Sequence, residues 1–109
     1  MIVHEGGAAP AFEDRWDTHD IDYVWVAWDE LLRGSYISDS TWVVPDTWTV
    51  LAEQQDASVT DQDSVTYDAA NGALLSTTAT SGRHRIANRV TLADGRQYER
   101  TVIIVVSQL

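Results

Sequence analysis

The sequence predicts an all-β domain: an immunoglobulin-like β-sandwich of about seven strands with one short helical turn and an extended N-terminal arm. Runs of aromatic and β-branched residues recur with turn residues roughly every eight to twelve positions, which is typical of such sandwiches. The last two runs flank Asp94-Gly95, a dipeptide that closes β-hairpins. The chain has 109 residues and no cysteine, so a packed hydrophobic core must stabilise it without disulfides.

The first half is expected to contain three strands and the helical turn. IDYVWVAW, residues 21–28, is apolar on both faces, in the manner of a central strand covered on both sides. DELLRG, residues 29–34, has acids at its start, two leucines and a closing glycine, a pattern that predicts a single helical turn. A crossover of this kind would lead into a strand that can lie in the other sheet. Strands are expected over 36–44, ended by Pro45, and over 47–51.

The middle of the chain is polar and gives weaker signals. AEQQDASVTDQD, residues 52–63, is expected to be irregular, and residues 64–67 to form a short strand. DAANG, residues 68–72, has the composition of a turn, and a short strand and a loop should follow it.

The final hairpin is expected to join residues 83–92 to residues 96–106. Its second strand ends in TVIIVV, residues 101–106, a β-prone run without charge. As a bare edge this run would promote aggregation. We therefore expect the N-terminal arm, the other sheet or another subunit to cover it.

Residues 1–20 are expected to form an extended acidic arm beside a sandwich domain of residues 21–109. The arm has two glycines, a proline and five acids, and its few large apolar residues show no sustained periodicity. We expect the sandwich to fold without it.

Charge limits the classes of partner. The net charge is -10, all seven basic residues are arginine, and five of them follow Asp68, whereas fifteen of the seventeen acids lie at or before it. Nucleic acid is not expected as a partner, because its recognition depends on a basic face. No apolar run has the length of a membrane span, and the N-terminus lacks the features of a signal peptide, so neither a membrane partner nor Sec-type export is expected.

The sequence contains little that indicates a catalytic or metal-binding site. His19 lies near Asp20 and Asp22, but a lone histidine among acids is more often solvated than a metal ligand. DQDSVTYD lacks the central glycine and the final glutamate of a calcium loop. The chain also lacks a G-x-S-x-G elbow and a glycine-rich phosphate loop. We expect no enzymatic activity, no cofactor and no bound metal.

Two surface features indicate protein partners. All five tryptophans lie in the first half, more than a core of this size requires, and tryptophan is enriched at interface hot spots. Alternation along RHRIANR puts its three arginines on one sheet face, where Glu99 or the acidic half of a neighbouring copy could pair with them. An all-core set of tryptophans and an ordinary solvated arginine face are the alternatives. The candidate interface residues are Phe12, Trp16, Trp28, Trp48, Arg83, Arg85 and Arg89.

Two sequence blocks resemble a known family. The first has Asp22-Tyr23, an aromatic run, L-x-x-G-x-x-I over residues 31–37 and W-x-V-P over residues 42–45. The second is NRVTLADGRQYERTVIIVV, residues 88–106, with its D-G-R turn. In this order and spacing they are similar to the phage fiber-tail adaptor family, small Ig-like virion proteins of tailed bacteriophages. The middle of the chain matches poorly, and Val26-Ala27 stands where the family often has Asp-Trp.

The resemblance implies an Ig-like structural protein of the virion, located in the tail or neck. It would be an adaptor that connects fibers or other components to the tail, present in multiple symmetric copies and bound to other virion proteins such as ring and fiber components. A capsid decoration (cement) protein is the first alternative. A carbohydrate-binding Ig-like module, with Trp16 between Asp14 and Asp17 as a sugar platform, is an alternative of another class.

Overall fold

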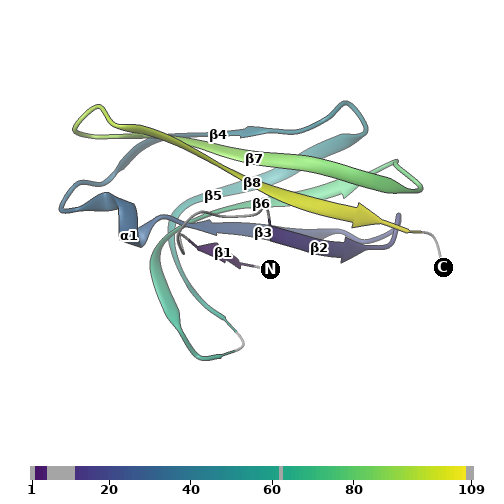
Figure 1. The fold of residues 1–109 in the computed structure, drawn as a ribbon, viewed down its shortest axis with the longest axis horizontal. Coiled ribbons are helices and arrows are strands. Elements are labelled where there is room, and N and C mark those ends of the chain that lie inside the picture. The colour runs from purple at the N-terminus through teal and green to yellow at the C-terminus, as the bar shows by residue number, and fades with distance from the viewer. Residues whose placement is uncertain (1, 5–11, 62, 108–109) are drawn as a thin grey trace.

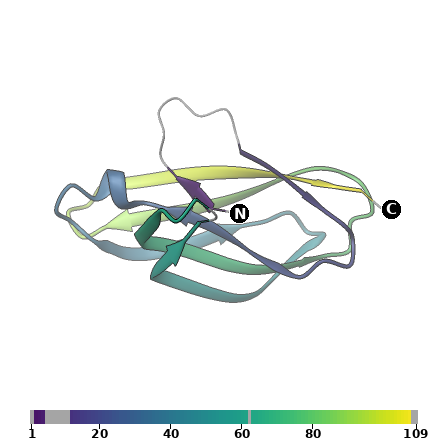
Figure 2. The ribbon, with the colours of Figure 1, turned by 90° about the horizontal axis from the view of Figure 1, so that it is seen from below.

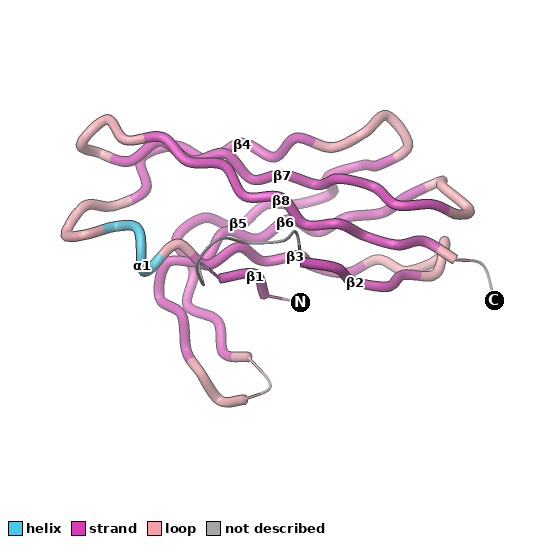
Figure 3. The backbone as a smooth tube through the Cα atoms, viewed as in Figure 1, coloured by secondary structure: helices cyan, strands magenta, loops and turns pink. Residues whose placement is uncertain are grey.

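Two four-stranded β-sheets packed face to face make up the protein (Figure 1). The computed structural model describes residues 2–4, 12–61 and 63–107, and side chains from residue 15 on. In this part of the chain α1 (Asp29–Leu32) is the one helix (Figure 3). The strands are β1 (Ile2–His4), β2 (Phe12–Trp16), β3 (Asp22–Ala27), β4 (Ile37–Val43), β5 (Trp48–Thr60), β6 (Thr66–Thr77), β7 (Gly82–Leu92) and β8 (Gln97–Val106).

The strand order is that of an immunoglobulin-like sandwich. The first sheet has the order β1-β3-β6-β5 and the second sheet the order β2-β8-β7-β4. Apart from β2, this strand order matches the constant-type pattern, in which strands A, B, E and D form one sheet and C, F and G the other, although β1 pairs with β3 in parallel. The predicted fold class is therefore confirmed.

The N-terminal segment belongs to the sandwich, which corrects the expected division into an arm and a domain. β1 pairs in parallel with β3 of the first sheet, and β2 pairs in parallel with β8 of the second. Trp16 is 4% exposed and lies in the hydrophobic core. Because β2 runs along Val102–Val106, it covers the edge of the TVIIVV strand, one of the three coverings that the sequence indicated.

The connector between the sheets has the predicted form. β3 lies in the first sheet and β4 in the second, and α1 crosses between them. Leu31 and Leu32 are half-buried against the core. The turn ends with Arg33 and Gly34 at φ 48° and 83°, where a glycine meets no steric penalty.

The middle of the chain differs from the prediction, because β5 and β6 are strands of 13 and 12 residues. The polar stretch after residue 51 stays in β5, with register shifts that include one between Gln54 and Ala57. DAANG lies within β6, where Asn71 and Gly72 are buried. Gly72 is required there, since an added Cβ would lie 2.6 Å from atoms of the Trp25 ring.

Two buried asparagines join the sheets. Asn88 Oδ1 of β7 accepts hydrogen bonds from Trp28 Nε1 at 2.9 Å and from Asn71 Nδ2 of β6 at 3.0 Å. Asn88 Nδ2 donates to Ser40 Oγ at 2.9 Å and to the Thr41 carbonyl at 3.2 Å. All four side-chain hydrogen-bonding positions of Asn88 are thereby used, as a buried amide requires.

The far ends of β5 and β6 extend beyond the sandwich as a two-stranded hairpin, which we call the projecting hairpin (residues 57–68). Figure 1 shows it leading away from β4, β7 and β8, and in Figure 2, seen from below, it points toward the viewer. None of its described residues, 57–61 and 63–68, is buried. Two strands without a covered face are only marginally stable by themselves.

Candidate functional site

The three tryptophans chosen as interface candidates lie in the core, which corrects that expectation. Trp16, Trp28 and Trp48 are 4%, 1% and 4% exposed. The rings of Trp16 and Trp48 meet edge to face with centroids 5.5 Å apart. A buried Trp16 also removes the sugar platform on which the carbohydrate-binding alternative depended. Phe12 lies in β2 opposite Val102, and its side chain is outside the described part of the structure.

A partly exposed tryptophan that the sequence prediction missed lies on the outer face of the first sheet. Trp25 stacks on Tyr23 with centroids 5.2 Å apart, and Gln54 Nε2 donates to the Tyr23 hydroxyl at 3.3 Å. Strand alternation contained the signal, because Val24 and Val26 occupy the inner face and leave Tyr23 and Trp25 outside.

Arg83, Arg85 and Arg89 lie together on the outer face of the second sheet, as predicted, and we call this surface the arginine face. All three are exposed, whereas Ile86 and Val90 of the same strand are buried. Arg89 forms the expected ion pair with Glu99 of β8. Both partners are largely exposed, so the pair contributes at most about 1 kcal/mol to stability.

A hollow lies beside Arg89 on the same face, with a volume of about 370 Å³. Thr91 and Thr41 line it, Asp39 stands on the β4 side and Glu99 on the β8 side. Two carboxylates therefore flank this end of the arginine face, whereas Arg83 and Arg85 lie toward the start of β7. Among the described side chains, this face therefore has a basic end at Arg83 and Arg85 and a mixed end at Arg89.

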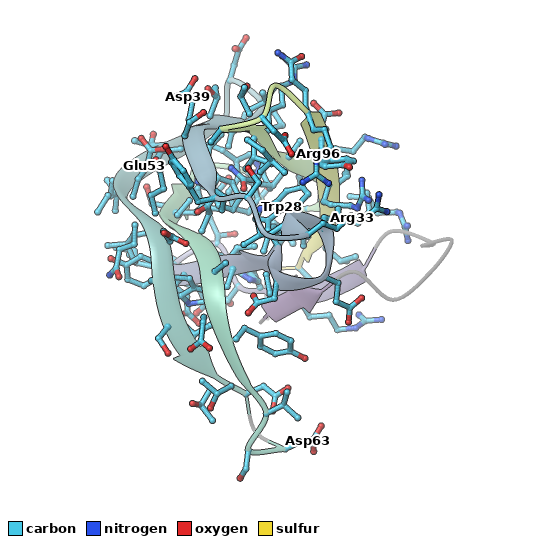
Figure 4. The ribbon with its side chains drawn as sticks, turned by 90° about the vertical axis from the view of Figure 1, so that its left-hand side faces the viewer. Trp28, Arg33, Asp39, Glu53, Asp63 and Arg96 are labelled. Carbon is cyan, nitrogen blue, oxygen red and sulfur yellow. The ribbon has the colours of Figure 1, made fainter. Side chains whose placement is uncertain are left out.

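Arg96 clamps the connector to the final hairpin. Its Nη1 and Nη2 donate to the carbonyls of Leu31 and Leu32 at 2.9 and 2.6 Å, and its Nε donates to Asp94 Oδ2 at 2.8 Å. The last turn of a helix leaves carbonyls without partners inside the helix, and here a cation satisfies two of them. A hydrogen bond from the backbone N–H of Arg96 lowers the pKa of the Asp94 carboxyl, and the Arg96 guanidinium lowers it further. Figure 4 shows Arg96 beside the connector.

The other end of the connector is fixed to β6. The Asp29 carboxylate accepts hydrogen bonds from the backbone N–H groups of Asp68 at 2.8 Å and Ala69 at 3.1 Å. The Trp28 N–H donates to the Ala69 carbonyl at 2.9 Å. Tyr36, 62% exposed, stands at the exit of this connector. The connector thus ends in an exposed aromatic side chain, Tyr36, next to backbone that hydrogen bonds hold in place.

The projecting hairpin is acidic, and hydrogen bonds to Asp61 connect its described residues near the turn. The Asp61 carboxylate accepts from the N–H groups of Asp63 at 2.8 Å and Val65 at 3.0 Å. Val65 is 46% exposed. Burial, followed by the carboxylates of Asp61, Glu30, Asp29 and Asp63, raises the pKa of Tyr67 at the base of the hairpin. The hairpin therefore lies in a negative electrostatic field.

Neither metal-ligand clusters nor a spanning helix occur in the described ranges. No group of three or more histidine, aspartate or glutamate side chains is placed there to hold a metal ion. No helix in those ranges is both long and apolar enough to cross a membrane.

Comparison with known proteins relates the chain to a fold and to no family. No protein-family model and no curated protein matches it. Its structure is similar to that of the cysteine protease inhibitor EhICP2 from Entamoeba histolytica, with a TM-score of 0.52 and 10% identity over 96% of this chain and 93% of the inhibitor's chain. At that identity the likeness shows the β-sandwich fold alone.

Proposed function

We propose that this chain is a non-enzymatic structural protein of a tailed-bacteriophage particle, an adaptor in the tail or neck that connects fibers or other components to the tail. The observation that carries the proposal is the clamp of Arg96. Arg96 belongs to the D-G-R turn of the second sequence block, and it binds the carbonyls of Leu31 and Leu32 in the first. The two blocks that resemble the adaptor family are therefore parts of one physical unit.

This unit suits an adaptor because it is held rigid before any partner arrives. The clamp fixes the connector at one end, and the Asp29 carboxylate fixes it at the other. A preorganised surface loses less conformational entropy on binding, so more of the contact energy appears as affinity. Tyr36 and Arg33, both exposed at this end, are residue types that are enriched at interface hot spots.

Mass spectrometry of purified particles tests the proposal. We expect the chain in intact virions, at a copy number that matches a tail or neck ring. Absence from intact particles would refute it. A copy number close to that of the shell protein would instead support the capsid decoration alternative.

A variant connects this test to the clamp. Arg96→Ala removes both bonds to the connector carbonyls, and we expect it to lower incorporation into particles while the sandwich stays folded by circular dichroism. Glu53→Ala, which removes an exposed charged side chain of β5 and leaves the clamp intact, is the control. Equal incorporation of Arg96→Ala and the native protein would show that the clamped unit is not the binding surface.

A further inference from the structure

We propose that copies of this chain bind one another head to tail, with the projecting hairpin of one copy docked on the basic end of the arginine face of the next. This inference deepens the proposed function and rests on it, because a component arranged in repeated copies needs a contact between copies. The occupant of the arginine face is then a second copy of the same chain.

The two surfaces lie on opposite sides of the molecule. The projecting hairpin extends from the first sheet, away from β7 and β8, which carry the arginine face (Figure 1). In Figure 4, Asp63 lies at the far tip of the hairpin and Asp39, on the outer side of the second sheet, lies at the other end of the view. The hairpin cannot reach the arginine face of its own copy. A contact between two different surfaces is heterologous, and it produces a ring where the rotation closes and a filament where it does not.

Charge complementarity selects the second copy as the occupant. Asp61, Asp63 and Asp68 are the charged residues of the hairpin sequence, which contains no arginine, lysine or histidine. Arg83 and Arg85 are exposed on the arginine face. After burial, nearby carboxylates that include Asp61 and Asp63 also raise the pKa of Tyr67, so the negative field extends to the base of the hairpin. Opposite potentials on two surfaces steer them together and fix their register.

The mixed end of the same face limits where the hairpin can dock. Asp39 and Glu99 flank the hollow near Arg89, and carboxylates facing the acidic tip would repel it. Docking is thereby directed to Arg83 and Arg85, whose aliphatic stems can cover the exposed Val65 side chain. The contact then combines an apolar centre with charged pairs around it.

The hairpin also has a structural reason to bind. Its strands have no buried residue in the described range, so no packed face stabilises them in the isolated molecule. The net charge of -10 opposes association over long distances. At physiological salt the Debye length is about 8 Å, so this general repulsion is screened while direct contacts are retained.

Sedimentation velocity of the full chain over a concentration range, at about 0.15 M salt, tests the proposal. We expect concentration-dependent association that weakens about tenfold or more in Asp63→Arg and in Arg85→Glu, because each reversal places like charges together. Neither the Asp63 carboxylate nor the Arg85 guanidinium takes part in the hydrogen bonds that the Asp61 carboxylate accepts. Glu53→Arg, on an exposed part of β5, changes the net charge equally with Asp63→Arg and should associate as the native protein does.

The decisive measurement is an equimolar mixture of Asp63→Arg and Arg85→Glu. The reversed hairpin of one variant can then pair with the reversed face of the other, so association should return. A native chain that stays monomeric, a Glu53→Arg loss equal to that of Asp63→Arg, or a mixture without recovery would each overturn the proposal. Circular dichroism confirms that each variant is folded. These measurements need no phage, so absence of the chain from virions would refute the proposed function independently of them.

Discussion

Trp16 provides the sharpest test of the fold, because it was predicted from the sequence to lie on a partner surface, whereas the structure places it in the core. The ring is 4% exposed and meets Trp48 edge to face at 5.5 Å. Truncation of a buried tryptophan to alanine typically costs about 3–5 kcal/mol, a large part of the roughly 5–15 kcal/mol that stabilises a domain. Trp16→Ala should therefore lower the urea midpoint by about 1.5 M or more, for a slope of about 1–2 kcal/mol per molar.

Urea unfolding followed by far-UV circular dichroism measures this effect, with Trp25→Ala as the control. Trp25 is half-buried on the outer face, so its truncation should cost less, about 1–2 kcal/mol. A Trp16→Ala protein within about 1 kcal/mol of the native one, at an unchanged slope, would refute the core assignment. Deletion of residues 1–20 should destabilise at least as much as Trp16→Ala, since it also removes the β2 ladder.

Three further predictions follow from the packing and the clamp. Asn88→Ala leaves the buried Trp28 indole N–H without an acceptor and should cost about 2–5 kcal/mol in urea unfolding; a loss below about 1 kcal/mol would contradict the buried network. Gly72→Ala puts a methyl group into the Trp25 ring and should cost about 1–3 kcal/mol and change the near-UV circular dichroism, whereas an unchanged spectrum would show that the ring does not lie there. Asp94 has a lowered pKa in the fold, so its ionised form contributes stability above the unfolded pKa, and this is lost as the pH falls through the folded pKa. Asp94→Asn should accordingly lose less stability than the native protein between about pH 5 and pH 2.5, measured as urea midpoints. Equal losses of stability in the two proteins would contradict the lowered pKa of Asp94.

The elements that local chemistry determines were predicted from the sequence. The connector turn depends on acids at its start and on Gly34, which takes a φ of 83°. The final hairpin depends on Asp94-Gly95, and Gly95 has a φ of 95°. The alternation that gathers Arg83, Arg85 and Arg89 follows from strand geometry alone.

The elements that tertiary contacts determine were missed. Asn71 and Gly72 favour turns by local preference, yet one binds Asn88 across the sheets and the other makes room for Trp25. No local pattern contains either contact, because the partners are distant in the sequence. The count of tryptophans likewise indicated a surplus without showing that Trp16 is buried.

The pairing of β2 with β8 also has a consequence for the order in which the molecule is made. β2 comes from the start of the chain and β8 from its end, and Trp16 pairs with Val106. Contacts between such distant residues form slowly, because a long loop must close before they contribute. During synthesis, Trp16 leaves the ribosome long before its partner strand exists. The second sheet therefore closes last, and until then β2 has no strand to pair with, although Trp48, on which the Trp16 ring packs, is already made.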